Sequence, residues 1–111
     1  MATIYDIIIA GGGIAGLYAA RELSKAKLKV LLVDQTSTLG STAWTPAITL
    51  EKFSLPKEGI NAPFNEVIFG TLKKEKKWVS NQNIGYVLDY KRMSTLVLEE
   101  AKINGCIVLT Q

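Results

Sequence analysis

Three glycines near the start of the sequence have the spacing expected of a site for linked phosphate groups. Gly11, Gly13 and Gly16 form the pattern G-x-G-x-x-G. In such a pattern the first glycine permits a tight turn, the second lets the main chain approach a pyrophosphate, and the third lets a helix pack closely on a strand. The first N–H groups of the following helix have no partner inside the helix, so an anion can accept from them. The spacing therefore predicts a dinucleotide-binding turn.

An acidic residue stands where such a turn requires one. The strand candidate 29–33, apolar from Val30 on, ends at Asp34, close to the separation of about 20 residues at which a carboxylate accepts from the ribose hydroxyls. A carboxylate there would repel the additional phosphate of NADP, which favours FAD, with NAD as the alternative. The simpler alternative is a βαβ unit in which the glycines only make a turn and Asp34 only caps a loop. The predicted cofactor-binding residues are Gly11, Gly13, Ile14, Ala15, Gly16, Asp34 and Gln35.

The elements that must position these residues follow in the expected order. The run 4–10 has the apolar, β-branched character of a strand buried on both faces in a parallel sheet. The segment after the glycines has apolar residues at mostly helical spacing, and the run 29–33 is a second buried strand. The charged residues expected to face water on this helix are Arg21, Glu22, Lys25 and Lys27. Strand, turn, helix and strand together indicate an α/β, Rossmann-like unit.

The remaining sequence predicts a small β-layer and a second helix. All three prolines lie in the segment 37–64, which we interpret as an excursion outside the core. The segments 67–72 and 77–79 indicate a hairpin, and 84–88 a third strand of the same layer. Asp89 is expected to cap a helix over 91–104, closed by Gly105 and followed by a strand over 106–110. We expect a single domain over 1–111, with 37–88 inserted between the second and last parallel strands.

Composition excludes several classes of site. The chain has 111 residues, no histidine and a single cysteine, so it contains no internal disulfide and no material for a metal site or a Cys/His or Ser/His nucleophile. No apolar run approaches the roughly 18 residues that cross a bilayer, so any membrane contact is expected to be peripheral and the location cytoplasmic. The lysine cluster 73–77 is interpreted as a solvated turn and predicts no nucleic-acid partner. The catalytic residues stay unknown.

The order of elements resembles that of the FAD-dependent oxidoreductases of the geranylgeranyl reductase type, within the wider aromatic-hydroxylase-like flavoprotein class. The glycine pattern carries the resemblance, with the small residue Ala20 four positions after Gly16. A second match is 85–89, followed by a helix and then by the segment 104–108. The resemblance implies bound FAD and a parallel sheet in which the last strand docks beside the second, giving the order third, second, first. It further implies hydride transfer from reduced flavin to isoprenoid double bonds.

Departures from that family are also informative. Tyr90 stands where the family usually has an arginine that contacts the flavin's phosphates or ribityl chain, and Lys91 or Arg92 would be its substitute. The segment 41–46 replaces a cysteine-bearing, glycine-rich stretch near the flavin ring. The family's second half, with a Gly-Asp motif that closes over the flavin, is not in this sequence. The resemblance thus implies a fragment or one subunit of a split enzyme.

An incomplete flavoprotein fold leaves one sheet edge open. The strand over 4–10 would expose unpaired backbone groups, which favours another chain or a homo-oligomer as its cover. The alternative function is a non-catalytic NAD- or FAD-binding module, or a degenerate remnant of the enzyme. Aspartate at position 34, which is frequent in NAD proteins, keeps this alternative open.

Overall fold

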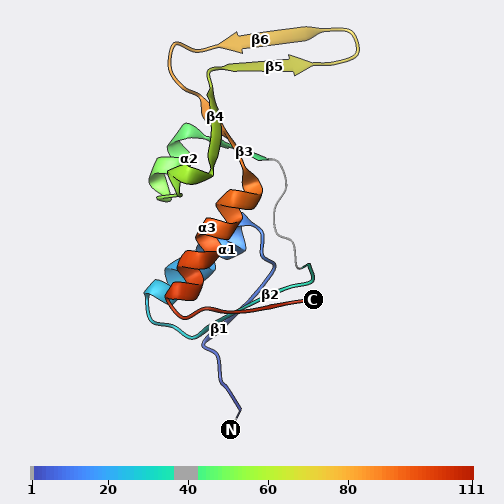
Figure 1. Cartoon of the computed structure of the whole chain (residues 1–111). Coiled ribbons are helices and arrows are strands. Elements are labelled where there is room, and N and C mark those ends of the chain that lie inside the picture. The colour runs from blue at the N-terminus through green and yellow to red at the C-terminus, as the bar shows by residue number, and fades with distance from the viewer. Residues whose placement is uncertain (1, 37–42) are drawn as a thin grey trace.

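A computed structural model describes residues 2–36 and 43–111, and Figure 1 shows their arrangement. The elements in chain order are β1 (Ile7–Ala10), α1 (Ile14–Lys25), β2 (Val30–Asp34), β3 (Ala43–Pro46), α2 (Ala47–Lys52), the 3-10 turn η1 (Lys57–Gly59), β4 (Ile60–Phe64), β5 (Glu66–Gly70), β6 (Glu75–Val79), β7 (Gly85–Leu88), α3 (Tyr90–Ile103) and β8 (Ile107–Thr110). The molecule is elongated, with principal extents of 62 × 28 × 19 Å.

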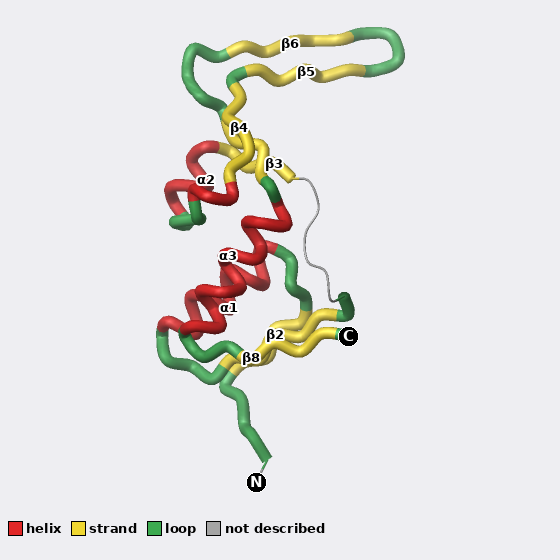
Figure 2. Tube along the Cα trace, in the orientation of Figure 1, coloured by secondary structure: helices red, strands yellow, loops and turns green. Residues whose placement is uncertain are grey.

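A three-stranded parallel sheet has the order β1-β2-β8. Ile9, Leu32 and Val108 lie opposite one another in the register and pack toward the core. Helices α1 and α3 cover this face side by side, as Figure 2 shows. The predicted α/β class and the strand order third, second, first are confirmed. The division into one domain with an inserted segment stays a prediction.

The opposite face of the sheet is bare, which corrects the prediction of strands buried on both faces. Ile8 is 64% exposed and Leu109 is 54% exposed, and Val33 and Ile107 of the same face are also exposed. Their apolar pattern is that of a doubly covered sheet, but the described residues provide a covering layer for one side only. The first strand is also shorter than predicted, since β1 begins at Ile7 rather than at Ile4.

Helix α3 forms as predicted, because its two ends carry the expected signals. The Asp89 carboxylate accepts from the Arg92 N–H at 3.1 Å, which satisfies one of the orphan donors of the first turn. Gly105, just beyond the helix, has a φ of +99°, a conformation that glycine adopts without steric cost. Met93, Val97 and Ala101 are fully buried against α1 and the sheet.

The β-layer differs from the prediction. Strand β7 pairs with β3 and β4 in its own antiparallel sheet, whereas the hairpin β5–β6 forms a separate two-stranded sheet that projects from the end of the molecule (Figure 1). The described part of segment 37–64 is not wholly outside the core, because Leu50 of α2 is 4% exposed and belongs to the central apolar cluster. The lysine cluster is not wholly a turn, since β6 begins at Glu75. Residues 37–42 of the excursion lie outside the described residues.

Arg21 is buried, contrary to the expectation that it faces water. Its side chain donates to the carbonyl oxygens of Phe53 at 2.8 Å and Ser54 at 3.1 Å, where α2 ends. It also pairs with Glu22 at 2.9 Å and with Glu100 of α3 at 3.4 Å. A buried charge is tolerated when it is paired and hydrogen-bonded, so Arg21 joins α1, α3 and the end of α2.

Within the described part of the chain, no helix is both long and apolar enough to span a bilayer. Cys106, between α3 and β8, is 4% exposed, and burial raises the pKa of its thiol. It behaves as a small apolar side chain of the core, as the sequence predicts.

The burial of Cys106 predicts slow chemical modification. Because the thiolate is the reactive form and both burial and the raised pKa disfavour it, a thiol-specific reagent at neutral pH should label the native protein far more slowly than the urea-unfolded chain. Cys106 is the only cysteine, so the labelled fraction measured by mass spectrometry reports on this site alone. Equal rates in the native and unfolded states would contradict the packing described.

Candidate functional site

The predicted glycine turn lies at the carboxyl end of β1, between that strand and α1. Gly11 has a φ of +111°, which residues with a Cβ rarely adopt, and its N–H donates to the Val33 carbonyl oxygen at 2.7 Å. The turn is thereby tied to the end of β2. The backbone then passes to Gly13, whose carbonyl oxygen accepts from the Leu17 N–H at 2.9 Å and so begins α1.

Gly16 brings α1 into direct contact with this turn. A Cβ placed on Gly16 would collide with the Gly11 carbonyl oxygen and lie 3.4 Å from the Ile9 side chain. A side chain at this position would push the first turn of the helix away from the strand. Gly16 therefore has the packing role that the sequence predicts.

The first helical turn of α1 has unpaired backbone N–H groups that lie next to the glycine turn. Neither a side-chain cap nor an acidic residue is found there, and the N–H groups of Ala15 and Gly16 have no acceptor among the described residues. A Cβ on Gly13 would have only the Tyr90 hydroxyl within 4 Å, at 3.9 Å, so the space where a Gly13 side chain would lie is open. Unpaired donors at the positive end of a helix, beside bare main chain, form a site that suits an anion.

Asp34, the last residue of β2, lies against the same turn. One carboxylate oxygen accepts from the Gly12 N–H at 2.6 Å. The other accepts from the Thr36 N–H at 2.7 Å and the Thr36 hydroxyl at 2.8 Å. These hydrogen bonds, first that from the Thr36 backbone, hold the pKa of Asp34 below its ordinary value. Gln35, the last of the predicted binding residues, is exposed beside it.

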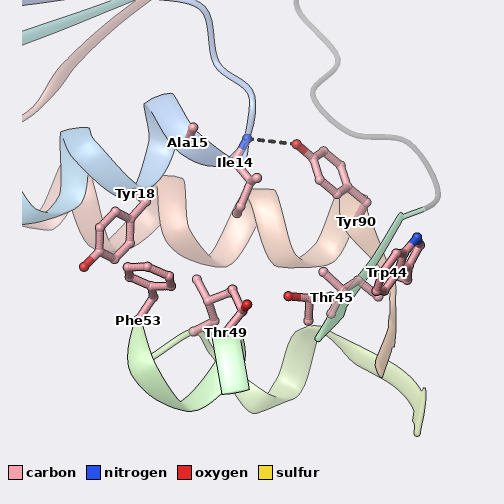
Figure 3. Close-up of a pocket in the computed structure, with 10 residues that line it drawn as sticks. Ile14, Ala15, Tyr18, Trp44, Thr45, Thr49, Phe53 and Tyr90 are labelled. Atoms are coloured by element: carbon pink, nitrogen blue, oxygen red, sulfur yellow. Dashed lines mark hydrogen bonds between the residues drawn. The ribbon is translucent and has the colours of Figure 1, made fainter. Parts of the chain in front are cut away.

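Tyr90 was not among the predicted binding residues, but its hydroxyl accepts from the Ile14 N–H at 2.8 Å (Figure 3). The two residues are separated by 76 positions, so no local pattern indicates this contact. The only sequence signal is the place of Tyr90 directly after the helix cap Asp89. Lys91 and Arg92, the proposed substitutes for the family's arginine, follow Tyr90 in the first turn of α3, and both are exposed.

An apolar cavity of about 350 Å³ adjoins the turn. Figure 3 shows Ile14 and Tyr18 of α1 lining one side, with Phe53, Thr49 and Trp44 on the side of α2 and β3. Tyr90 lies where the cavity meets the glycine turn. Of the segment 41–46, the structure describes only 43–46, and Ser41 and Thr42 lie outside the described residues. Among described residues no cluster of three or more metal-ligating side chains occurs.

The strand, glycine turn and helix agree with a comparison with protein families. The model of the NAD(P)-binding Rossmann-like domain matches residues 9–72, more than half of the sequence. The chain belongs to this Rossmann-like family. The match spans the whole of the glycine turn, α1, β2 and Asp34, so the predicted binding residues from Gly11 to Gln35 lie within it, whereas Tyr90 lies outside it.

Relatives of this Rossmann-like protein include a reductase of the expected type. Digeranylgeranylglycerophospholipid reductase from Sulfolobus acidocaldarius is 30% identical over 109 residues, which cover 91% of this chain and 24% of the reductase. A solved geranylgeranyl bacteriochlorophyll reductase-like protein from Thermoplasma acidophilum matches with a TM-score of 0.78 at 23% identity, over 96% of this chain and 30% of that protein. The resemblance to the N-terminal part of the geranylgeranyl reductase type is confirmed.

The fold is shared more widely. The myxobacterial chondrochloren halogenase, described as a variant of FAD-dependent halogenases, matches with a TM-score of 0.73 at 16% identity, over 98% of this chain and 29% of that protein. The chain spans between 10% and 26% of the length of the curated relatives that it matches. The two lipid reductases and the solved structures share nearly the whole of this chain, whereas the other three curated relatives match less than half of it.

The contact between Gly16 and Gly11 predicts a large loss of stability in Gly16→Ala. Alanine favours a helix over glycine by about 1 kcal/mol, but the added Cβ meets a backbone carbonyl that cannot rotate away, and overpacking typically costs about 1–3 kcal/mol. Because the overlap with the Gly11 carbonyl is severe, we take the upper end of that cost and expect a net loss of about 2 kcal/mol in the free energy of unfolding, measured with urea. Gly70→Ala is the matched control, because nothing lies within 4 Å of a Cβ there. Equal stability of both variants would contradict the close contact.

The hydrogen bonds of Asp34 predict that the stability of the fold decreases at acidic pH. Its pKa is lowered in the folded state from the ordinary value of 3.8, so the carboxylate stabilises the fold above that value, and this contribution disappears as the pH falls through the native pKa. Carbon-13 NMR of the Asp34 carboxyl should show a titration midpoint below 3.8. In Asp34→Asn the corresponding pH dependence of stability should vanish. A midpoint at or above the ordinary value would refute the assigned hydrogen bonds.

Proposed function

We propose that the glycine turn binds the pyrophosphate of FAD and that Asp34 and Gln35 bind its adenosine ribose. The observation that carries this proposal is the open space beside Gly13, next to helix N–H groups that have no acceptor among the described residues. The residues proposed to bind the cofactor are Gly11, Gly13, Ile14, Ala15, Gly16, Asp34 and Gln35.

Asp34 can still accept a hydrogen bond, as the binding of a ribose hydroxyl requires. Among the described residues, the oxygen that accepts from Gly12 takes one hydrogen bond only, so a lone pair is left for a ribose hydroxyl. The remaining two bonds, both from Thr36, fix the carboxylate in place beside the turn. Its lowered pKa keeps it charged at neutral pH, and a charged carboxylate disfavours the 2′-phosphate of NADP.

The choice of FAD over NAD is supported by the kind of protein that shares the fold. The halogenase is described as FAD-dependent, and the relative with the longest matched segment is named as a reductase of an isoprenoid lipid. The name of the family model, which mentions NAD(P), supports the alternative cofactor.

The proposed activity is that of the FAD-binding part of a flavin-dependent oxidoreductase related to the geranylgeranyl reductases. When bound and reduced, the flavin would supply a hydride to an isoprenoid or similar double bond. The residues of this chain would bind and orient the adenine end of the cofactor. Hydride transfer also requires the ring to be positioned and screened from water, so we propose that the chain acts as a fragment or as one subunit of a split enzyme.

We also infer that another chain, or a second copy, covers the open side of the parallel sheet. The support is the bare apolar face at Ile8 and Leu109 together with the outer edge of β1, which pairs with no other strand among the described residues. Exposed apolar patches of this kind mark association surfaces. The proposal includes a cytoplasmic location, with membrane contact at most peripheral.

A second candidate function is a non-catalytic NAD- or FAD-binding module or a degenerate remnant of the enzyme. Aspartate rather than glutamate at position 34 favours this candidate. Purified protein separates the two functions: a yellow preparation with a flavin absorption spectrum supports the first, and a colourless preparation that binds NAD in calorimetry without reductase activity supports the second.

Gly13→Val tests the proposed pyrophosphate site. The new side chain would occupy the open space before the turn, so binding of FAD and of ADP should be abolished in calorimetry. Gly13 has a φ of −70°, which valine can adopt, so the free energy of unfolding should change by no more than about 1 kcal/mol. Gly70→Val on the projecting hairpin is the control and should bind as the wild type does. Equal binding by Gly13→Val would refute the proposed site.

A further inference from the structure

The Tyr90 hydroxyl joins the first turns of two helices that are distant in sequence. Tyr90 is the first residue of α3, and its oxygen accepts from the N–H of Ile14, the first residue of α1 (Figure 3). The positive ends of both helices therefore lie together at the glycine turn. The oxygen is also the nearest atom to the open space before Gly13, at 3.9 Å from the position of a Cβ there.

The chemistry of a phenol leaves this hydroxyl with a free donor. A tyrosine hydroxyl carries one O–H and can also accept hydrogen bonds. Here the oxygen accepts from Ile14, and no acceptor for its own O–H is found among the described residues. An N–H at a helix start polarises the oxygen that it binds, which makes the attached O–H a better donor.

We propose that Tyr90 is a binding residue that donates its hydroxyl hydrogen to a pyrophosphate oxygen of the bound dinucleotide. The inference depends on the proposed function of the glycine turn and adds one donor to it. The Ile14 N–H donates to the Tyr90 oxygen, and the Tyr90 O–H then donates to the ligand. The N–H groups of Ala15 and Gly16 donate to the ligand directly. The contact is made by a neutral group and adds no cation to the site.

Two features show why tyrosine suits this place. Its ring lines the apolar cavity together with Ile14 and Trp44, so the body of the side chain is packed while the hydroxyl lies at the edge beside the turn. The Asp89 cap holds the first turn of α3 and thereby the backbone from which the ring extends. A substitution that keeps the ring and removes the hydroxyl can therefore test the hydrogen bond without changing the packing.

Tyr90→Phe removes only the oxygen and leaves the ring in the cavity. Calorimetric binding of ADP, which carries the pyrophosphate, should weaken about tenfold to a hundredfold, as expected for the loss of a hydrogen bond to a charged group. Binding of adenosine, followed by NMR titration, should be unchanged because adenosine has no phosphate. Tyr5→Phe, the same change in the segment before β1, is the control and should leave ADP affinity unaltered.

The outcomes separate this proposal from the proposed function. Wild-type protein that binds neither ADP nor FAD would refute the nucleotide site itself. Wild-type binding of ADP with equal binding by Tyr90→Phe would refute the role of Tyr90 alone. Equal weakening of ADP and adenosine binding would show that Tyr90 only supports the structure, and would also overturn the proposal. The Ile14 amide resonance in nitrogen-15 NMR should shift in Tyr90→Phe. An unshifted resonance would contradict the hydrogen bond between the Ile14 N–H and the Tyr90 hydroxyl.

Discussion

The close approach of α1 to the end of β1 is the constraint on which the rest of the structure depends. It is possible only because Gly16 has no side chain, since a Cβ there would overlap the Gly11 carbonyl oxygen. The approach brings the first N–H groups of α1 over the glycine turn and directs them into open space. The same turn is tied to β2 through Val33 and Asp34, so helix, turn and both strands form one rigid unit.

Polar contacts of buried or half-buried groups connect this unit to the remaining elements. Arg21 is fully buried on α1 and binds the carbonyl groups that end α2, which positions one wall of the apolar cavity. Tyr90 connects the start of α3 to the start of α1. Because unpaired buried polar groups are costly, such contacts select one arrangement of the helices among those that the apolar core alone would permit.

The surface that stays uncovered is consistent with the size of the chain relative to its relatives. The parallel sheet has helices on one face, and the hairpin β5–β6 projects from the body with Phe69 and Trp78 exposed. The chain spans 24% of the lipid reductase that it matches and 30% of the solved reductase-like protein. In a doubly wound sheet the second face is normally covered as well, so the bare side is where further structure or a second chain would pack.

The sequence by itself determined most of the local elements, including the glycine turn on which the proposed site depends. The glycine spacing and the cap at Asp89 are short-range signals that act on their own backbone, and the apolar runs indicate strands without indicating how many faces are covered. Asp34 is recognisable from its place at the end of a strand, although its contact with Gly12 is tertiary. The tertiary structure alone decided that Arg21 is buried, that β7 pairs with β3 and β4, and that Tyr90 contacts Ile14. These features depend on groups far apart in the chain, whose meeting is governed by how the helices and sheets pack, and a helical or strand period carries no information about the partner.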